Sequence, residues 1–291
     1  NENTIELQLT SFTNSNGIAD FILDGNDFGT AIVTTRAQDY IPVQTNLQFS
    51  DDLPEIVLNQ DSISINELVG NNDGNINPSE FIEISFSINN NSQDQVDNLY
   101  VSLSSLSDYI TILNDSYLAG NLNGNTSVNV SGFELAINSY IPDDHDNKVR
   151  VSIISDNLEW NYELSLNILS GNIIFNDVII INDDNNNGHL DRGESADLIV
   201  SLSNMGSMDL IDVVANIDNS ELPINIIGTN LNFSNIEVGN SVNSINQIGV
   251  SIDTQFPNGT IINIPTEISS SNGFSANITI PLQIGEISED D

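Results

Sequence analysis

Apolar and polar residues alternate with a period of two along many short stretches of this chain, which are rich in Ile, Val, Ser, Thr and Phe. This alternation is typical of strands with one buried and one exposed face. Clusters that favour tight turns separate the stretches, at Asn123-Gly124, Asn258-Gly259 and Asn272-Gly273. No window carries an apolar stripe of helical spacing, so the sequence predicts an all-β protein. The predicted strands include Thr4–Thr10, Phe81–Asn89, Asn98–Leu103, Leu198–Ser203, Ile261–Ile268 and Ser275–Leu282.

The chain also contains an internal repeat, in which residues 62–169 align with residues 178–284. Each copy has a β-rich run, a loop of Asn, Asp and Gly that ends in Glu, and an alternating strand that ends in Asn. Three pairs of residues match: Glu80 with Glu194, Glu83 with Asp197, and Asn90 with Asn204. Three later pairs of segments also match: Asn98–Leu103 with Asp212–Ile217, Ile110–Leu113 with Ile224–Ile227, and Val149–Ile154 with Ile261–Ile268. A copy of about 110 residues is close to the ~100 of an immunoglobulin-like sandwich. We therefore expect two tandem immunoglobulin-like β-sandwiches, at 53–171 and 172–291.

Residues 1–52 differ from both copies and predict a partial immunoglobulin-like β domain. Thr13–Phe21 has the pattern of a turn that leads into a strand, and Thr30–Arg36 and Ile41–Phe49 have the pattern of two more strands. So few strands rarely form a stable domain alone. Either this segment packs on the next module, or it is the back half of a sandwich whose front strands precede Asn1. We favour the second interpretation.

The most specific motif of the chain is the twelve-residue loop 183–194, which has the form D-x-[DN]-x-[DN]-G-x₅-E. Ca²⁺ needs six to eight oxygen ligands, and this spacing bends one short segment around such an ion. Gly188 permits the sharp turn, and Leu190 is expected to anchor the loop to the core. The expected oxygen donors are Asp183, Asn185, Asn187, the carbonyl of His189, Asp191 directly or through water, and both oxygens of Glu194. The alternative is a turn rich in Asn and Asp that matches the motif by chance.

The equivalent loop of the first copy is altered, because Val69 stands at its first position. Its remaining candidate donors are Asn71, Asp73, Asn75, Asn77 and Glu80, around the turn residue Gly74. Loss of the first carboxylate weakens this site, unless Glu67 reaches in. Calcium modules outside cells bind with Kd of roughly 10⁻⁴–10⁻³ M, so either loop is expected to act as a structural staple rather than a sensor.

Charge narrows the classes of partner. The chain has four basic and 42 acidic residues, which gives a formal net charge of −38. Such a chain cannot form the basic patch that binds nucleic acid or anionic membranes, and it attracts cations instead. There is no cysteine, and no apolar run reaches the ~20 residues of a membrane span. The chain starts at Asn1 with neither Met nor a signal-peptide pattern, which suggests a processed or excerpted piece of a longer protein.

The sequence favours a protein that is not an enzyme. It has no metalloprotease, serine-hydrolase or phosphate-loop motif, and its two histidines are His145, in a turn, and His189, in the metal loop. A pair of carboxylates that hydrolyses glycosides stays open among so many acids. Sugar sites usually also cluster aromatic residues, however, and the single tryptophan, Trp160, has the pattern of strand packing.

The opening of each repeat resembles the accessory domains of gingipain-like secreted cysteine peptidases and related surface proteins of Bacteroidetes. The resemblance rests on the loops that end in Asn77-Pro78-Ser79-Glu80 and Asp191-Arg192-Gly193-Glu194, each followed by a strand that ends in Asn. Thr13–Phe21 and Tyr40-Ile41-Pro42 are similar to the immunoglobulin-like domain that follows the catalytic domain of those peptidases. The resemblance implies an extracellular or cell-surface location. The catalytic cysteine and histidine of that family have no counterpart here.

Two functions remain open on these grounds. The first is a calcium-stabilised stalk or accessory region, associated with a larger secreted protein or a cell-surface component. The second is a self-associating filament or surface-layer subunit, in which a strand from one chain completes the partial domain of another. Adhesion through loop tips is compatible with the sequence, but no motif specifically supports it.

Overall fold

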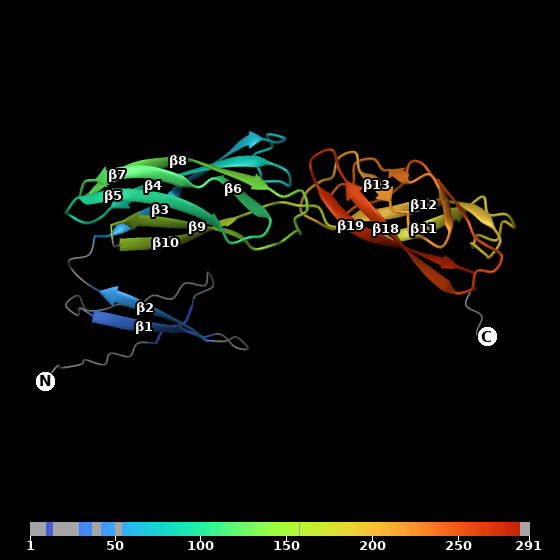
Figure 1. Cartoon of the computed structure of the whole chain (residues 1–291), viewed down its shortest axis with the longest axis horizontal. Helices are drawn as coiled ribbons and strands as arrows, with labels where there is room; N and C mark the ends of the chain where they lie inside the picture. Colours follow the sequence, from blue (N-terminus) through green and yellow to red (C-terminus); the bar gives the residue numbers. More distant parts are fainter. Residues whose placement is uncertain (1–9, 14–28, 37–41, 50–53, 157, 286–291) are drawn as a thin grey trace. The chain divides into compact units, whose positions relative to one another are not determined.

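The computed structural model describes residues 10–13, 29–36, 42–49, 54–156 and 158–285 (Figure 1). Every regular element in these ranges is a β-strand, so the prediction of an all-β protein is confirmed. No helix in the described part of the chain is long and apolar enough to cross a membrane. The chain divides into two compact units, Asn1–Glu55 and Ile56–Asp291. Most of the predicted strand Thr4–Thr10, most of Thr13–Phe21 and the pair Tyr40-Ile41 lie outside the described residues.

The first unit contains one described pair of strands. The antiparallel partners β1 (Gly29–Thr35) and β2 (Val43–Phe49) pair without a bulge, from Gly29 opposite Phe49 to Thr35 opposite Val43. Both strands lie where the alternating pattern predicts them. The interpretation of this unit as half of a sandwich stays a prediction.

The second unit begins with a sandwich of eight strands in two sheets. In chain order its strands are β3 (Ile56–Val69), β4 (Phe81–Asn90), β5 (Val96–Ser105), β6 (Ile110–Asn114), β7 (Ser116–Leu122), β8 (Thr126–Ile137), β9 (Asn147–Ser155) and β10 (Leu158–Leu166). One sheet has the order β3-β4-β8-β6 and the other β10-β9-β5-β7. Without β7, this is the order of an immunoglobulin constant-type sandwich, to which β7 adds an edge strand beside β5.

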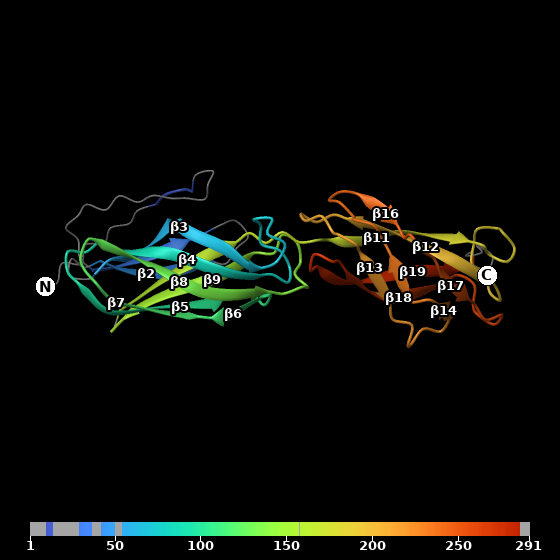
Figure 2. The same ribbon diagram turned by 90° about the horizontal axis from the view of Figure 1, so that it is seen from above.

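The second sandwich repeats this arrangement. Figure 2 shows most of its strands in a view turned by 90°. Its strands are β11 (Ile173–Ile181), β12 (Ser195–Asn204), β13 (Val214–Ile217), β14 (Asn225–Ile227), β15 (Asn230–Asn232), β16 (Ser241–Asn243), β17 (Ile248–Ser251), β18 (Thr260–Ser269) and β19 (Ser275–Ile284). The sheets have the orders β11-β12-β17-β14 and β15-β13-β18-β19, and β16 also pairs with β12. The strands β16 and β17 together take the place of β8, which is itself interrupted by a bulge.

Each sandwich buries its own hydrophobic core, because alternate side chains of every central strand point between the two sheets. In β9, for example, Val149, Val151 and Ile153 are fully buried. The first cluster extends from Ile56 to Ile168 and the second from Ile173 to Ile284. Ile76 and Leu190, which stand at the same position of the two candidate metal loops, belong to these clusters. The cores therefore anchor both loops, as expected for Leu190.

Candidate metal centres

The loop between β11 and β12 winds around one point through a series of turns closed by its own side chains. Buried Asp183 accepts hydrogen bonds through Oδ2 from the backbone N–H groups of Asn187 at 2.7 Å and Gly188 at 3.2 Å. The Oδ1 atoms of Asn185 and Asn187 accept from backbone N–H groups two residues ahead, at 2.9 and 2.7 Å. Gly188 has φ of +82°, a conformation that costs glycine little. The motif residues thus fold the loop without help from flanking helices.

The side chains of this loop converge. Asn185 donates from Nδ2 to Glu194 Oε1 and, at 3.5 Å, to Asp191 Oδ2. Asn187 Nδ2 donates to the same Asp191 oxygen at 2.9 Å, and Glu194 Oε2 accepts from the N–H of Asp191 at 3.1 Å. Five predicted donor side chains are therefore gathered in one loop. The predicted role of the His189 carbonyl stays a prediction; its own N–H closes the turn at Asn187.

This set of donors fits a hard cation. Three carboxylates, from Asp183, Asp191 and Glu194, lie among amide groups in one short segment. Carboxylate, amide and backbone oxygens are the ligands that Ca²⁺ prefers. Within the part of the chain that the structure describes, no group of three or more His, Cys, Asp or Glu is placed to hold a metal by itself.

The loop between β3 and β4 has the same central turn. Gly74 and Gly188 share φ of +82°, and Asn72 at 59° matches Asn186 at 57°. The bond from Asn77 N–H to Glu80 Oε2, at 2.8 Å, corresponds to the bond between Asp191 and Glu194. The two loops therefore share these turns and differ at their start, where β3 runs to Val69 while β11 ends at Ile181.

The predicted donor side chains of this first loop also lie together. Asn71 Nδ2 donates to Asp73 Oδ2 at 3.2 Å and to Asn77 Oδ1 at 3.0 Å, and Asn71 N–H donates to Glu80 Oε1 at 3.4 Å. Asn75 donates its backbone N–H to Asp73 Oδ1 at 2.7 Å. The side chains of Asn71, Asp73 and Asn77 are therefore in contact, and the carboxylate of Glu80 bonds to the backbone of Asn71 and Asn77. The ligand role of Asn75 stays a prediction.

Glu67 does reach into the first loop. Its Oε1 accepts from the N–H of Asn72 at 2.7 Å, while its Oε2 is buried without a hydrogen-bond partner. A β-bulge between Glu67 and Val69 interrupts the pairing of β3 with β4 just before the loop, and bulges re-aim neighbouring side chains. A side-chain carbon at Gly70 would collide with the carboxylates of both Glu67 and Glu80. Glycine at this position therefore leaves room for the two acids to approach.

Burial raises the pKa of Glu80, which is 3% exposed. The N–H groups of Asn77 and Asn71 lower this pKa, and the nearby charges of Glu67 and Asp73 raise it. The net result is a pKa above the ordinary value for glutamate, so ionisation of Glu80 costs more in the folded chain than in a free side chain. A bound divalent ion would relieve this cost.

The other singled-out residues have structural contacts. His145 Nδ1 lies 3.0 Å from Asn147 Oδ1, and its ring packs edge-on against Tyr109 at a centroid distance of 4.8 Å. Buried Asn147 in turn bonds to Ser107 and to the His145 carbonyl. Trp160 packs against the first core. These contacts give the turn at His145 and the aromatic side chain of β10 a role in the fold.

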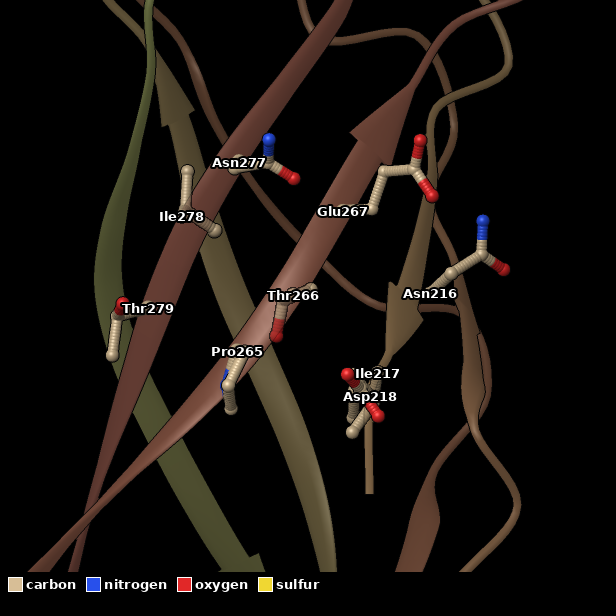
Figure 3. Close-up of a pocket in the computed structure, with 9 residues that line it drawn as sticks. All are labelled: Asn216, Ile217, Asp218, Pro265, Thr266, Glu267, Asn277, Ile278 and Thr279. Carbon is tan, nitrogen blue, oxygen red and sulfur yellow. The ribbon is translucent and has the colours of Figure 1, made fainter. Parts of the chain in front are cut away.

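An open depression lies beside β13, β18 and β19 (Figure 3). Its lining residues are Asn216, Ile217, Asp218, Pro265, Thr266, Glu267, Asn277, Ile278 and Thr279. Hydrogen bonds from the side chain and N–H of Ser220 lower the pKa of Asp218. Asp218 is therefore a weak base, and the lining offers carboxylates, hydroxyls and amides.

No family model and no curated protein matches this chain. A solved protein of unknown function from Porphyromonas gingivalis W83 overlaps 78% of this chain and 99% of its own, with 12% identity and a TM-score of 0.23. Red sea bream transglutaminase overlaps 79% of this chain with 9% identity and a TM-score of 0.30, and the match spans 31% of that enzyme. Neither likeness bears on function at these TM-scores.

Proposed function

We propose that this chain is a non-catalytic region of a secreted or cell-surface protein, in which calcium stabilises tandem β-sandwiches that serve as a stalk or accessory region. The observation that carries the proposal is the loop 183–194. Its side chains close the turns of a loop of this form, and its asparagine amides bond to the carboxylates of Asp191 and Glu194. A bound cation would offset the negative charge that the acids bring to this loop.

An extracellular location agrees with this chemistry, because loops of this kind outside cells bind calcium at roughly 10⁻⁴–10⁻³ M. At a net charge of −38, the chain also suits a medium in which salt screens its surface. The resemblance to accessory domains of gingipain-like peptidases supports the same location. The sequence motifs carry that resemblance.

The test is direct calcium binding by isothermal titration calorimetry on chain first stripped with EGTA. We expect two sites in the parent chain and one in Glu194→Gln. Asp184→Asn is the matched control, because Asp184 is the neighbouring acid whose Oδ2 accepts from the N–H of Ser195 at 2.9 Å. Two sites should remain in that variant. A parent chain that binds no calcium at millimolar concentration contradicts the proposal.

One observation favours the alternative, a self-assembling filament in which strands pass between chains. In the two-stranded sheet of the first unit, Ile32 of β1 is 65% exposed and Val43 of β2 is 63% exposed. Two strands with open apolar side chains gain stability when another strand or layer joins them. Size-exclusion chromatography and negative-stain microscopy separate the alternatives. Filaments that disappear when residues 1–55 are removed support strand exchange, and a monomer at high concentration supports the stalk.

A further inference from the structure

The first candidate loop, Val69–Glu80, holds the segment by which the chain leaves the first sandwich. The Ile76 carbonyl accepts from the N–H of Leu169 at 2.9 Å, and Ile76 and Ile168 form a parallel β-bridge. Asn77 Nδ2 donates to the Leu169 carbonyl at 3.4 Å. Two neighbouring loop residues thus fix the start of the connection to the second sandwich.

The same loop also contacts the second sandwich directly. Ser79 Oγ donates to the Gly273 carbonyl at 2.7 Å, in the turn between β18 and β19. A side-chain carbon at Gly273 would lie 2.6 Å from the Pro78 carbonyl oxygen and 2.9 Å from Ser79 Cβ. The two backbones therefore approach as closely as glycine allows.

The other contacts that the described residues make at this junction are polar. The Ser275 N–H donates to the Ser139 carbonyl at 2.9 Å, and the two hydroxyls lie 3.0 Å apart. Asp143 Oδ1 accepts from the N–H of Ser170 at 3.3 Å and from the hydroxyl of Ser207. The two cores are separate clusters, so no shared core fixes the sandwiches together. Relative motion is the usual behaviour of domains joined by a small polar interface.

We propose that a calcium ion in the first loop, with Glu67 supplying the carboxylate that Val69 lacks, locks the junction between the two sandwiches. This inference rests on the proposed calcium function and adds what one of its sites controls. Of the ligand candidates, Asn77 directly follows Ile76 and Glu80 directly follows Ser79. A cation that fixes them also fixes the residues that hold Leu169 and Gly273.

The second loop provides an internal comparison. Its Leu190 carbonyl accepts from the N–H of Gly285 at 2.8 Å. The second loop therefore holds the residue that follows β19, just as Ile76 of the first loop holds the segment that follows β10. Gly193 stands where the first loop has Ser79, so it has no hydroxyl to donate. Calcium in the second loop therefore stabilises one sandwich without acting on the junction.

The test measures the distance between the two sandwiches by double electron–electron resonance. The parent chain has no cysteine, so spin labels at Asn129→Cys of β8 and Asn263→Cys of β18, both exposed positions, report only the intended pair. We expect calcium to narrow the distance distribution of the parent relative to EGTA. Glu67→Gln should lose the narrowing, while Asp61→Asn, an exposed acid earlier on β3, and Glu194→Gln should keep it.

Calorimetry on the same variants separates failure of this inference from failure of the proposed function. Ser79→Ala should still bind two calcium ions, but calcium should no longer narrow its distance distribution. That result would show that the contact of Ser79 with Gly273 transmits the effect of calcium to the junction. A parent that binds two ions with an unchanged distance distribution overturns the lock and leaves the calcium function standing. A parent that binds none overturns both. Narrowing that persists in Glu67→Gln overturns the role of that residue.

Discussion

Asn204 makes in the second sandwich the same hydrogen bonds that Asn90 makes in the first. Each donates from Nδ2 to two backbone carbonyls, those of Asp94 and Leu122 for Asn90 and those of Met208 and Ile236 for Asn204. Each Oδ1 also accepts a backbone N–H two residues later. Both side chains are almost fully buried, and they close the end of the second strand against the loop that follows. The asparagine that ends each repeated strand is thus a structural residue.

Replacing Asn90 by Ala should therefore destabilise the first sandwich by roughly 1–3 kcal/mol, because two carbonyls and one N–H lose their partner in a buried place. Asn89→Ala is the control, since the neighbouring side chain is only half-buried. Urea denaturation of both variants measures the difference. Equal midpoints for the two variants would show that the Asn90 bonds contribute nothing.

Calcium should raise the melting temperature of the chain. Free calcium at about 100 times Kd would add ~2.7 kcal/mol for one site, which amounts to several degrees for a domain of this size. Calorimetric scans in EGTA and in millimolar calcium should show this rise for the parent and for Asp184→Asn, and a smaller rise for Glu194→Gln. If Glu194→Gln kept the full rise, the second loop would not be the site.

The first loop should release calcium as the pH falls. Because the pKa of Glu80 is raised by folding, the calcium-free folded chain binds that proton more tightly than the unfolded chain does. The stability contributed by this proton is present at low pH and is lost as pH rises through the folded pKa. Calcium competes with the same proton, so its affinity in the Glu194→Gln background should weaken from pH 7 to about pH 5. Calcium titrations at both pH values test this, and equal affinities would contradict it.

Gly188 should tolerate Asn better than Val. Its φ of +82° is strained for most residues, and a side-chain carbon there meets no atom within 4 Å, so backbone conformation alone decides the outcome. Asn visits this region readily, as Asn186 does two residues earlier, whereas a β-branched residue rarely does. Calorimetry should find two calcium sites in Gly188→Asn and one in Gly188→Val. The reverse order would refute this reading of the turn.

Most of the fold could be predicted from local patterns. Alternation located strands such as β18 and β19 to within a few residues, because every second side chain of a sandwich strand enters a core. The repeat anticipated the equivalence of β4 with β12 through the asparagine at the end of each strand. Short edge strands such as β15 and β16 could not be found this way, since a three-residue strand has too few positions to show a period.

The candidate loops were predictable because turn chemistry depends on local spacing. Asp183 and Gly188 act on neighbours within the same segment, so the sequence alone positions them. The sequence showed only that Glu67 could replace the missing carboxylate if its side chain reached the loop. Whether it does depends on a bulge in β3 and on the space left at Gly70, which local patterns do not reveal. The contact of Ser79 with Gly273 joins residues that are far apart in the chain, so no local sequence pattern predicts it.

The bonds from Ile76 to Leu169 and from Leu190 to Gly285 have a mechanical meaning. A tensile force on either sandwich enters through the segment that follows its last strand, β10 or β19. Such a force must break the hydrogen bond to the loop before it can break the hydrogen bonds between the last strand and its neighbour in the sheet. If calcium binds these loops as proposed, its concentration would change how firmly each of these bonds resists such a force, one module at a time.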